Sequence, residues 1–152
     1  MKSVTMMNNK LFFLCSLIEF IGRQQKLTRY EVVSALGHDT IKHIYEFADV
    51  LHCEPIAKVA DEYIESRELE IGNFDNITTC RYTVPSYWDI GKVYARLIQD
   101  VTGNTSEKNK IIKNLNEIYG SWISDSISNF NSDFFYQPHD YIKECYFEGK
   151  IL

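Results

Sequence analysis

The stretch that decides the fold class is residues 8–23, which read NNKLFFLCSLIEFIGR. Apolar residues recur in it at spacings of three and four, the period of an α-helix. These are Leu11, Leu14, Cys15, Ile18 and Ile21. Phenylalanines and a leucine between these positions widen the apolar stripe, so we expect a helix that is buried on most sides.

Helical signals continue on both sides of Gly37. The run Thr28-Arg29-Tyr30-Glu31 is a capping box, which opens a short helix that ends near Leu36. Gly37 fits the left-handed position that closes such a helix. Asp39 is then expected to cap a helix that continues to about His52.

The second part of the chain predicts further helices. Pro55 suits the first turn of one helix, and Pro85-Ser86 opens another that ends at Gly103. Apolar periodicity then predicts a long helix over 106–130, with Gly120 as a kink or a close-packing point, and a short helix over 139–148.

Residues 67–84 interrupt this pattern with glycine, asparagine and threonine, which are typical of a loop. Within it, 79–84 is expected to pair as a short strand. The whole predicts a single all-α bundle of about six to seven helices over 8–152, with packed halves 8–66 and 85–152. Residues 1–7 are expected to be disordered, with Met1, Met6 and Met7 as alternative starts.

Composition sets further bounds. Only 7 Gly and 3 Pro occur in 152 residues, too few for an all-β fold with many turns. The four cysteines are far apart and form no C-x-x-C pair, which indicates free thiols in a reducing cytosol. The apolar run 11–18 is too short to span a membrane and is interrupted by Glu19, so we expect a cytoplasmic protein without a membrane anchor.

Negative charge gathers in one segment. The net charge is −5, and residues 61–75 hold six acids against Arg67 alone. Such a segment repels phosphate and suits a basic groove on a protein partner. A solvated helix face is the plainer alternative.

Groups for catalysis or metal binding do not converge in the sequence. There is no glycine-rich phosphate loop and no nucleophile elbow. His43 and His52 would lie about 13 Å apart on one helix, too far to share a zinc ion. Cys53 follows His52 directly, and adjacent helical residues point apart. The sequence therefore predicts no catalytic, cofactor-binding or metal-binding residue.

Residues 29–52 have the outline of a helix-turn-helix, so a DNA-binding regulator is the alternative interpretation. The second helix would present Asp39 and Glu46 beside Lys42, a poor neighbour for phosphate. Nucleic-acid binding is therefore not the leading expectation.

Aromatic residues suggest an interaction surface. Tyr87 and Trp88 are neighbours, so they cannot both point into one core, and the C-terminal segment holds more aromatic rings than one short helix can bury. Tyrosine and tryptophan are enriched at binding hot spots. The predicted partner-binding residues are Glu68, Glu70, Asp75, Tyr82, Tyr87, Trp88, Tyr136 and Tyr141.

Residues 8–66 resemble a small helical family of unknown function from bacterial mobile and defence loci. The resemblance rests on Phe12-Phe13-Leu14-Cys15, on Tyr45 through Val50-Leu51-His52, and on Asp61-Glu62-Tyr63-Ile64. Members often lie beside genes for ADP-ribosyltransferase-like proteins, which implies a toxin–antitoxin pairing. The chain is also similar in kind to helical antitoxins that neutralise small alarmone synthetases.

The resulting hypothesis is an antitoxin-like inhibitor without enzymatic activity. It would neutralise a co-encoded toxin enzyme by direct protein–protein binding and a steric block of the substrate site. A homodimer would bury more of the aromatic surface.

Overall fold

The computed structural model describes residues 6–152, and this part of the chain is all helical, as expected. The expected disorder of residues 1–7 lies mostly outside the described residues. No strand occurs over 6–152. The elements are α1 (Asn9–Gln25), α2 (Arg29–Leu36), α3 (His38–Glu46), α4 (Ala48–Leu51), α5 (Ile56–Ser66), α6 (Tyr87–Thr102), α7 (Lys108–Tyr119), α8 (Trp122–Ser128), the 3-10 turn η1 (Phe134–Tyr136) and α9 (His139–Glu148).

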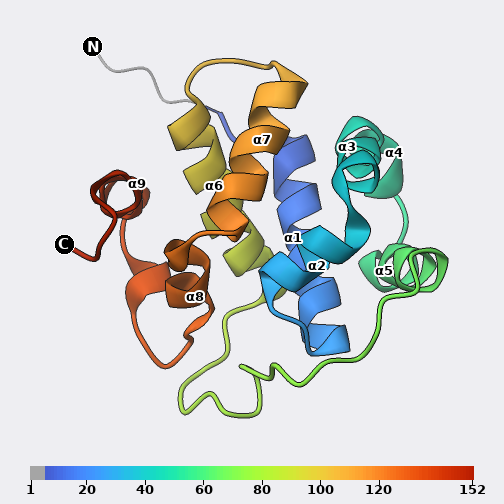
Figure 1. Ribbon diagram of the computed structural model, residues 1–152, viewed down its shortest axis with the longest axis horizontal. Coiled ribbons are helices and arrows are strands. Elements are labelled where there is room, and N and C mark those ends of the chain that lie inside the picture. The colour runs from blue at the N-terminus through green and yellow to red at the C-terminus, as the bar shows by residue number, and fades with distance from the viewer. Residues whose placement is uncertain (1–5) are drawn as a thin grey trace.

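Helix α1 is the centre of the bundle (Figure 1). Helix α6 lies along one side of it, while α2, α3, α4 and α5 contact it elsewhere. Helix α7 packs on α6 and α2, and α9 packs on α6 at the edge of the molecule. The apolar stripe of α1 is almost fully buried, which agrees with the pattern in residues 8–23. Helices from both sides of the 67–84 loop therefore share one core.

The start signals explain where the helices begin. The Thr28 hydroxyl accepts a hydrogen bond from the Glu31 amide, and the Glu31 carboxylate accepts one from the Thr28 amide, so the capping box is confirmed. At the start of α6, the Ser86 hydroxyl accepts a hydrogen bond from the Asp89 amide and caps the helix. Gly37 has a positive φ of 84°, as expected, but its ψ of 161° is extended, so α3 starts directly after it.

Two predicted helices are each divided in two. The helix expected from Asp39 to His52 breaks at Phe47 into α3 and α4, and Asp39 lies in the first turn of α3 instead of capping it. The helix expected over 106–130 breaks at Gly120, because Ser121 turns out of the helix and its hydroxyl accepts from the Ile123 amide to start α8.

The strand expected over 79–84 is wrong. The Asn131 side chain accepts from the Arg81 amide and donates to the Thr79 carbonyl, so a side chain takes the place of a strand neighbour. The backbone groups are thus satisfied without a ladder. The expected loop over 67–84 is confirmed.

This loop is tied to the C-terminal end of α1. The Gly72 amide donates to the Gln25 carbonyl and the Phe74 amide donates to the Lys26 carbonyl, each at 2.8 Å. The Asn76 side chain is buried and donates to the Ser128 carbonyl. The loop is therefore a fixed arm that crosses from α1 to α8.

None of the helices over residues 6–152 has the length and apolarity that crossing a membrane requires.

The four thiols differ sharply in exposure, which predicts their reactivity. Cys53 is exposed and Cys80 is half-buried, whereas Cys145 is buried and burial raises the pKa of Cys15 to about 12. Because the thiolate is the reactive form, we expect a colorimetric disulfide reagent to titrate one thiol rapidly in the native protein and all four in denaturant. The substitution Cys53→Ser should remove the rapid phase, and a rapid phase that survives it would contradict this assignment.

Candidate partner-binding site

Four aromatic rings from α1 and α6 form a continuous row at the surface. The ring of Trp88 lies 5.7 Å from Phe12 and 5.0 Å from Tyr87, and Tyr87 lies 5.1 Å from Phe20, measured between ring centroids. We call Phe12, Trp88, Tyr87 and Phe20 the aromatic row. Trp88 keeps 39% of its surface exposed while Tyr87 is half-buried, as the adjacency of the two residues predicted.

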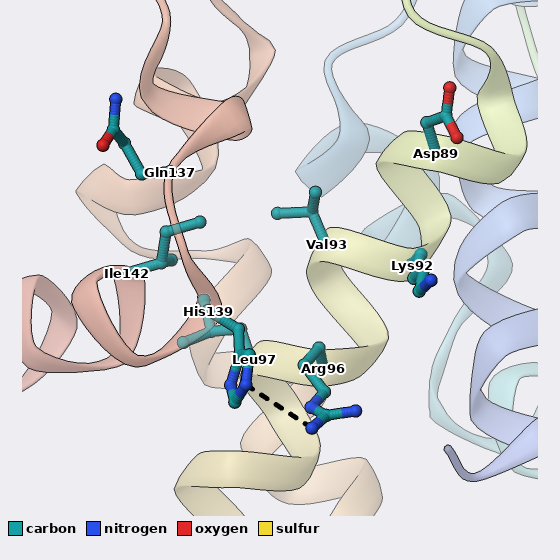
Figure 2. Close-up of a pocket in the computed structure, with 8 residues that line it drawn as sticks. All are labelled: Asp89, Lys92, Val93, Arg96, Leu97, Gln137, His139 and Ile142. Carbon is teal, nitrogen blue, oxygen red and sulfur yellow. Dashed lines mark hydrogen bonds between the residues drawn. The ribbon is translucent and has the colours of Figure 1, made fainter. Parts of the chain in front are cut away.

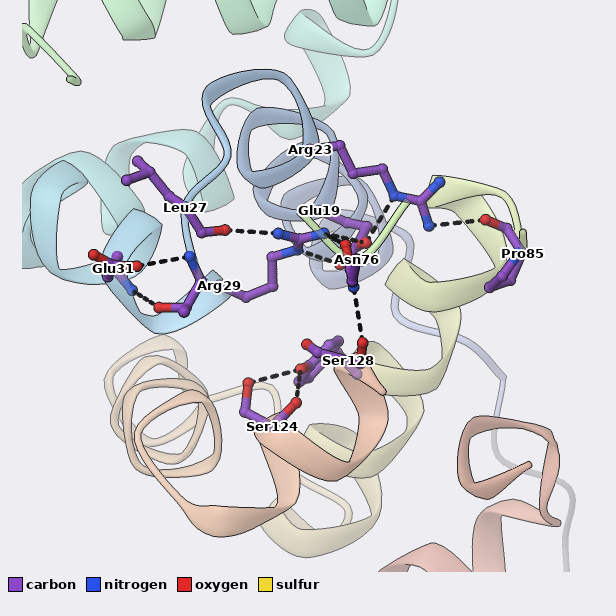
Figure 3. Close-up of polar contacts among 11 residues, drawn as sticks. Glu19, Arg23, Leu27, Arg29, Glu31, Asn76, Pro85, Ser124 and Ser128 are labelled. Atoms are coloured by element: carbon purple, nitrogen blue, oxygen red, sulfur yellow. Dashed lines mark hydrogen bonds and ion pairs between the residues drawn. The ribbon is translucent and has the colours of Figure 1, made fainter. Parts of the chain in front are cut away.

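A buried ion-pair network fixes the position of this row. The Arg23 guanidinium donates to the Glu19 carboxylate and to the Pro85 carbonyl, each at 2.8 Å. Pro85 immediately precedes the cap of α6, so these contacts hold the start of α6 against α1 (Figure 3). The sequence places Tyr87 and Trp88 in the first turn of α6, and the Arg23 hydrogen bond to Pro85 ties this turn to α1 in addition to the packing of the two helices.

Arg29 is the second cation of the network and is fully buried. Its guanidinium donates two hydrogen bonds to the Glu19 carboxylate, at 2.8 and 2.9 Å. It also donates to the Leu27 carbonyl and to the Asn76 side chain (Figure 3). The guanidinium thus joins α1 to α2 and to the 67–84 loop.

The electrostatics of the network favour its ionised state. Burial alone would raise the pKa of Glu19, but the charges and hydrogen bonds of Arg29 and Arg23 outweigh it and lower that pKa. Burial would also lower the pKa of Arg29, and the Glu19 charge raises it instead. Glu19 and Arg29 are therefore charged at neutral pH.

Beside the row lies a shallow groove of about 410 Å³, which we call the loop groove. Its walls come from the end of α1, the 75–78 turn and the first residue of α6. Asp75 is held there by hydrogen bonds from Thr78 and the Ile77 amide, which lower its pKa and keep it charged. The lining residues are Phe20, Arg23, Gln24, Lys26, Asp75, Ile77, Thr78 and Tyr87.

The structure brings part of the predicted partner-binding set together. Asp75 and Tyr87 line the loop groove, and Trp88 adjoins Tyr87 in the row. Glu68, Glu70 and Tyr82 are exposed on the arm that leads to the groove.

Two predicted residues lie elsewhere. Tyr136 is in η1, packs on Phe135 and is 81% exposed. Tyr141 is on α9, half-buried near Phe134, and its hydroxyl donates to the Leu152 carbonyl. They belong to a separate aromatic cluster around the C-terminal helix.

Two members of the row were missed from the sequence. Phe12 and Phe20 were assigned to the buried stripe of α1, but both are only partly buried. Their spacing of eight places them on one helix face at the edge of the stripe. That edge position was the signal that could have found them.

The other sequence candidates remain dispersed. His43, His52 and Cys53 are all exposed, and over residues 6–152 the grouping of potential metal ligands is a different one, Asp100, His139 and Asp140. On α3, the exposed acids Asp39 and Glu46 accompany Lys42, and Glu46 pairs with Lys108 of α7. This face of the helix-turn-helix outline thus carries acids where DNA would present phosphates.

A second concavity, of about 330 Å³, lies between α6 and α9 (Figure 2). Val93, Leu97 and Ile142 form an apolar floor, with Lys92, Arg96 and His139 at its rim. It combines apolar surface with a few polar groups, as small-ligand sites do.

Comparison of the chain with protein-family models, with curated proteins and with solved structures gave no match. The resemblance of residues 8–66 to a family from mobile and defence loci therefore stays a prediction.

Proposed function

We propose that this protein is an antitoxin-like inhibitor that binds a co-encoded toxin enzyme through the aromatic row and the loop groove. The observation that carries the proposal is the row itself, in which a partly exposed tryptophan packs on Phe12 and Tyr87 just after the Pro85 carbonyl that Arg23 binds. Aromatic side chains fixed before binding lose little conformational entropy on association. Such side chains are the usual anchors of protein interfaces.

The proposed mechanism is steric. Toxins that use ATP or NAD, or that modify RNA, bind anionic substrates and need a basic groove. The exposed acids of the 67–84 arm and Asp75, which lines the loop groove, would face the basic groove of the toxin and steer association. The aromatic row would supply the apolar contact that keeps the complex together. High salt should therefore slow association more than it speeds dissociation.

The first test is co-purification of the tagged protein with the product of its neighbouring gene. We expect a complex that survives high salt, and suppression of any toxicity of the neighbour. No complex and no rescue would contradict the proposal. Retention of the protein on DNA at low salt, lost in Lys42→Ala, would instead support the regulator interpretation.

Substitution of Trp88 tests the site. We expect Trp88→Ala to weaken the complex by roughly 30-fold, because hot-spot side chains contribute about 2 kcal/mol or more. The matched control is Phe147→Ala, which removes a 59% exposed ring at the end of α9, away from the row. Calorimetric titration measures both affinities, and melting curves check that both variants fold. Equal affinities for wild type and Trp88→Ala would show that the row is not the interface.

A further inference from the structure

Three potential metal ligands meet where α9 begins beside α6. The Nδ1 atom of His139 lies 2.7 Å from a carboxylate oxygen of Asp100 and 3.5 Å from one of Asp140. All three ligand atoms lie within 4.8 Å of one another. Asp100 and His139 are 39 residues apart in the sequence, so only the packing of α9 on α6 brings them together.

These separations are close to those of a metal site. Ligand atoms about 2.0–2.2 Å from a tetrahedral zinc ion lie roughly 3.3 Å from one another. The two distances from His139 bracket this value, and all three ligand atoms lie within 4.8 Å of one another, so the geometry requires rotations of the exposed His139 and Asp140 side chains around the less exposed Asp100. We propose that Asp100, His139 and Asp140 bind a divalent metal ion of the zinc class, with the remaining position open to solvent.

The chemistry of the donor set selects the class of ion. One imidazole nitrogen with two carboxylates suits Zn²⁺, Co²⁺ or Ni²⁺. Ca²⁺ and Mg²⁺ prefer all-oxygen sites with more ligands. The carboxylates of Asp100 and Asp140 together neutralise the charge of a divalent ion.

Metal binding would change the protonation of His139 and the position of Arg96 beside it. A proton on Nδ1, which would be donated to the Asp100 carboxylate, must leave, since a metal-bound nitrogen is deprotonated. The other ring nitrogen would then carry a proton and face Arg96, whose guanidinium lies 3.5 Å away (Figure 2). Arg96 also pairs with Asp100, since its Nε lies 3.7 Å from the carboxylate oxygen that does not face His139, so Arg96 would keep this ion pair while it turns away from the protonated ring nitrogen.

Metal binding should fasten α9 to the bundle. Helix α9 packs mainly on α6, and the three ligands bridge these two helices. An ion that binds the folded state alone stabilises it by mass action. Zinc is therefore expected to raise the melting temperature of the untagged, full-length chain by about 2–5 °C.

The test is calorimetric titration of the untagged chain with ZnCl₂, alongside melting curves with zinc and with EDTA. We expect one equivalent of bound zinc. His139→Gln and Asp140→Asn, both at exposed side chains, should each weaken binding at least tenfold and abolish the thermal shift. Melting in EDTA checks that these variants remain folded.

The matched control is His43→Gln, which removes an exposed imidazole from α3 and should leave zinc binding unchanged. The proposal is overturned if zinc does not bind, if binding survives in His139→Gln and Asp140→Asn, or if His43→Gln abolishes it. Because these experiments involve no partner, their outcome is independent of the proposed inhibitor function.

Discussion

Replacing Glu19 by alanine is expected to lower the free energy of unfolding by about 3–5 kcal/mol, because it leaves a buried arginine without its counter-ion. Glu19 and Arg29 have side chains that are 1% and 0% exposed, and two hydrogen bonds join them. Neither partner can reach water once the other is removed. Denaturant unfolding followed by circular dichroism measures the loss.

An exposed ion pair of similar geometry provides the matched control. Glu54 and Lys58 lie 2.9 Å apart, but their side chains are about half exposed, at 50% and 57%. Water solvates either charge when its partner is absent, so Glu54→Ala should leave stability nearly unchanged. If both glutamate substitutions cost the same, burial does not govern the strength of these pairs.

Where Glu19→Ala fails to fold, Glu19→Gln keeps the argument testable, since the amide retains the shape and part of the hydrogen bonding. The stability difference between the wild type and Glu19→Gln should also change with pH in a definite direction. The pKa of Glu19 is below its ordinary value of 4.5 in the folded protein, so its ionisation contributes stability that is present above that value and is lost as pH falls through the lowered pKa. The stability difference between wild type and Glu19→Gln should therefore be constant above about pH 5 and shrink below it. A difference that grows with acidity would contradict the ionised pair.

Local signals in the sequence predicted the helices well where a few adjacent residues decide the structure. The capping box at Thr28 and Glu31 involves four consecutive residues, and the Ser86 cap involves a similar span. The apolar period of residues 8–23 likewise predicted the buried α1. The break at Phe47 was missed because apolar periodicity runs across it, and the packing on both sides determines where the helix turns. Gly120 was expected as a kink or a close-packing point within one helix, and the structure goes further, because α7 ends there and α8 begins as a new helix.

The buried network was beyond local reasoning. Glu19 was interpreted only as the residue that interrupts an apolar run, and Arg29 only as a residue inside a capping box. A lone acid on a helix that is buried on most sides requires a cation nearby, which is a usable signal. The sequence still does not say which cation pairs with Glu19, because Arg23, Lys26 and Arg29 are all close to it along the chain. In the folded protein, Arg23 and Arg29 form the ion pairs with Glu19.

The candidate site was only partly predictable, because local signals indicate some of its residues and the packing of distant segments decides the others. The adjacency of Tyr87 and Trp88 indicated exposure, and the structure shows it for Trp88. Tyr136 and Tyr141 were grouped with them by residue type alone, and the fold separates them. Contacts such as Asn76 to Ser128, 52 residues apart, carry no local signal, yet they fix the arm that forms one wall of the loop groove.

Replacing Gly91 by alanine is the second change with a large expected effect. Gly91 lies where α6 crosses α1, and a Cβ atom there would stand 2.2 Å from the Ser16 hydroxyl oxygen and 2.7 Å from the Ser16 Cα and amide nitrogen. In an open helix, glycine to alanine stabilises by about 1 kcal/mol. Here the added methyl meets the backbone of α1, so the two helices must separate along their most extensive contact. Overpacking of this kind costs about 1–3 kcal/mol, occasionally more.

We therefore expect a net loss of stability for Gly91→Ala and a larger one for Gly91→Val, measured by denaturant unfolding. The substitution Ser16→Ala distinguishes the clash with the Ser16 hydroxyl from the clash with the Ser16 backbone. The Ser16 hydroxyl is buried and lacks a hydrogen-bond partner among residues 6–152, so its removal alone should be neutral or stabilising. Because two of the three close contacts are with the backbone of Ser16, the Ser16→Ala substitution should not rescue Gly91→Ala. Full rescue would mean that the hydroxyl alone sets the spacing between α1 and α6, and that the backbones can accept a side chain between them.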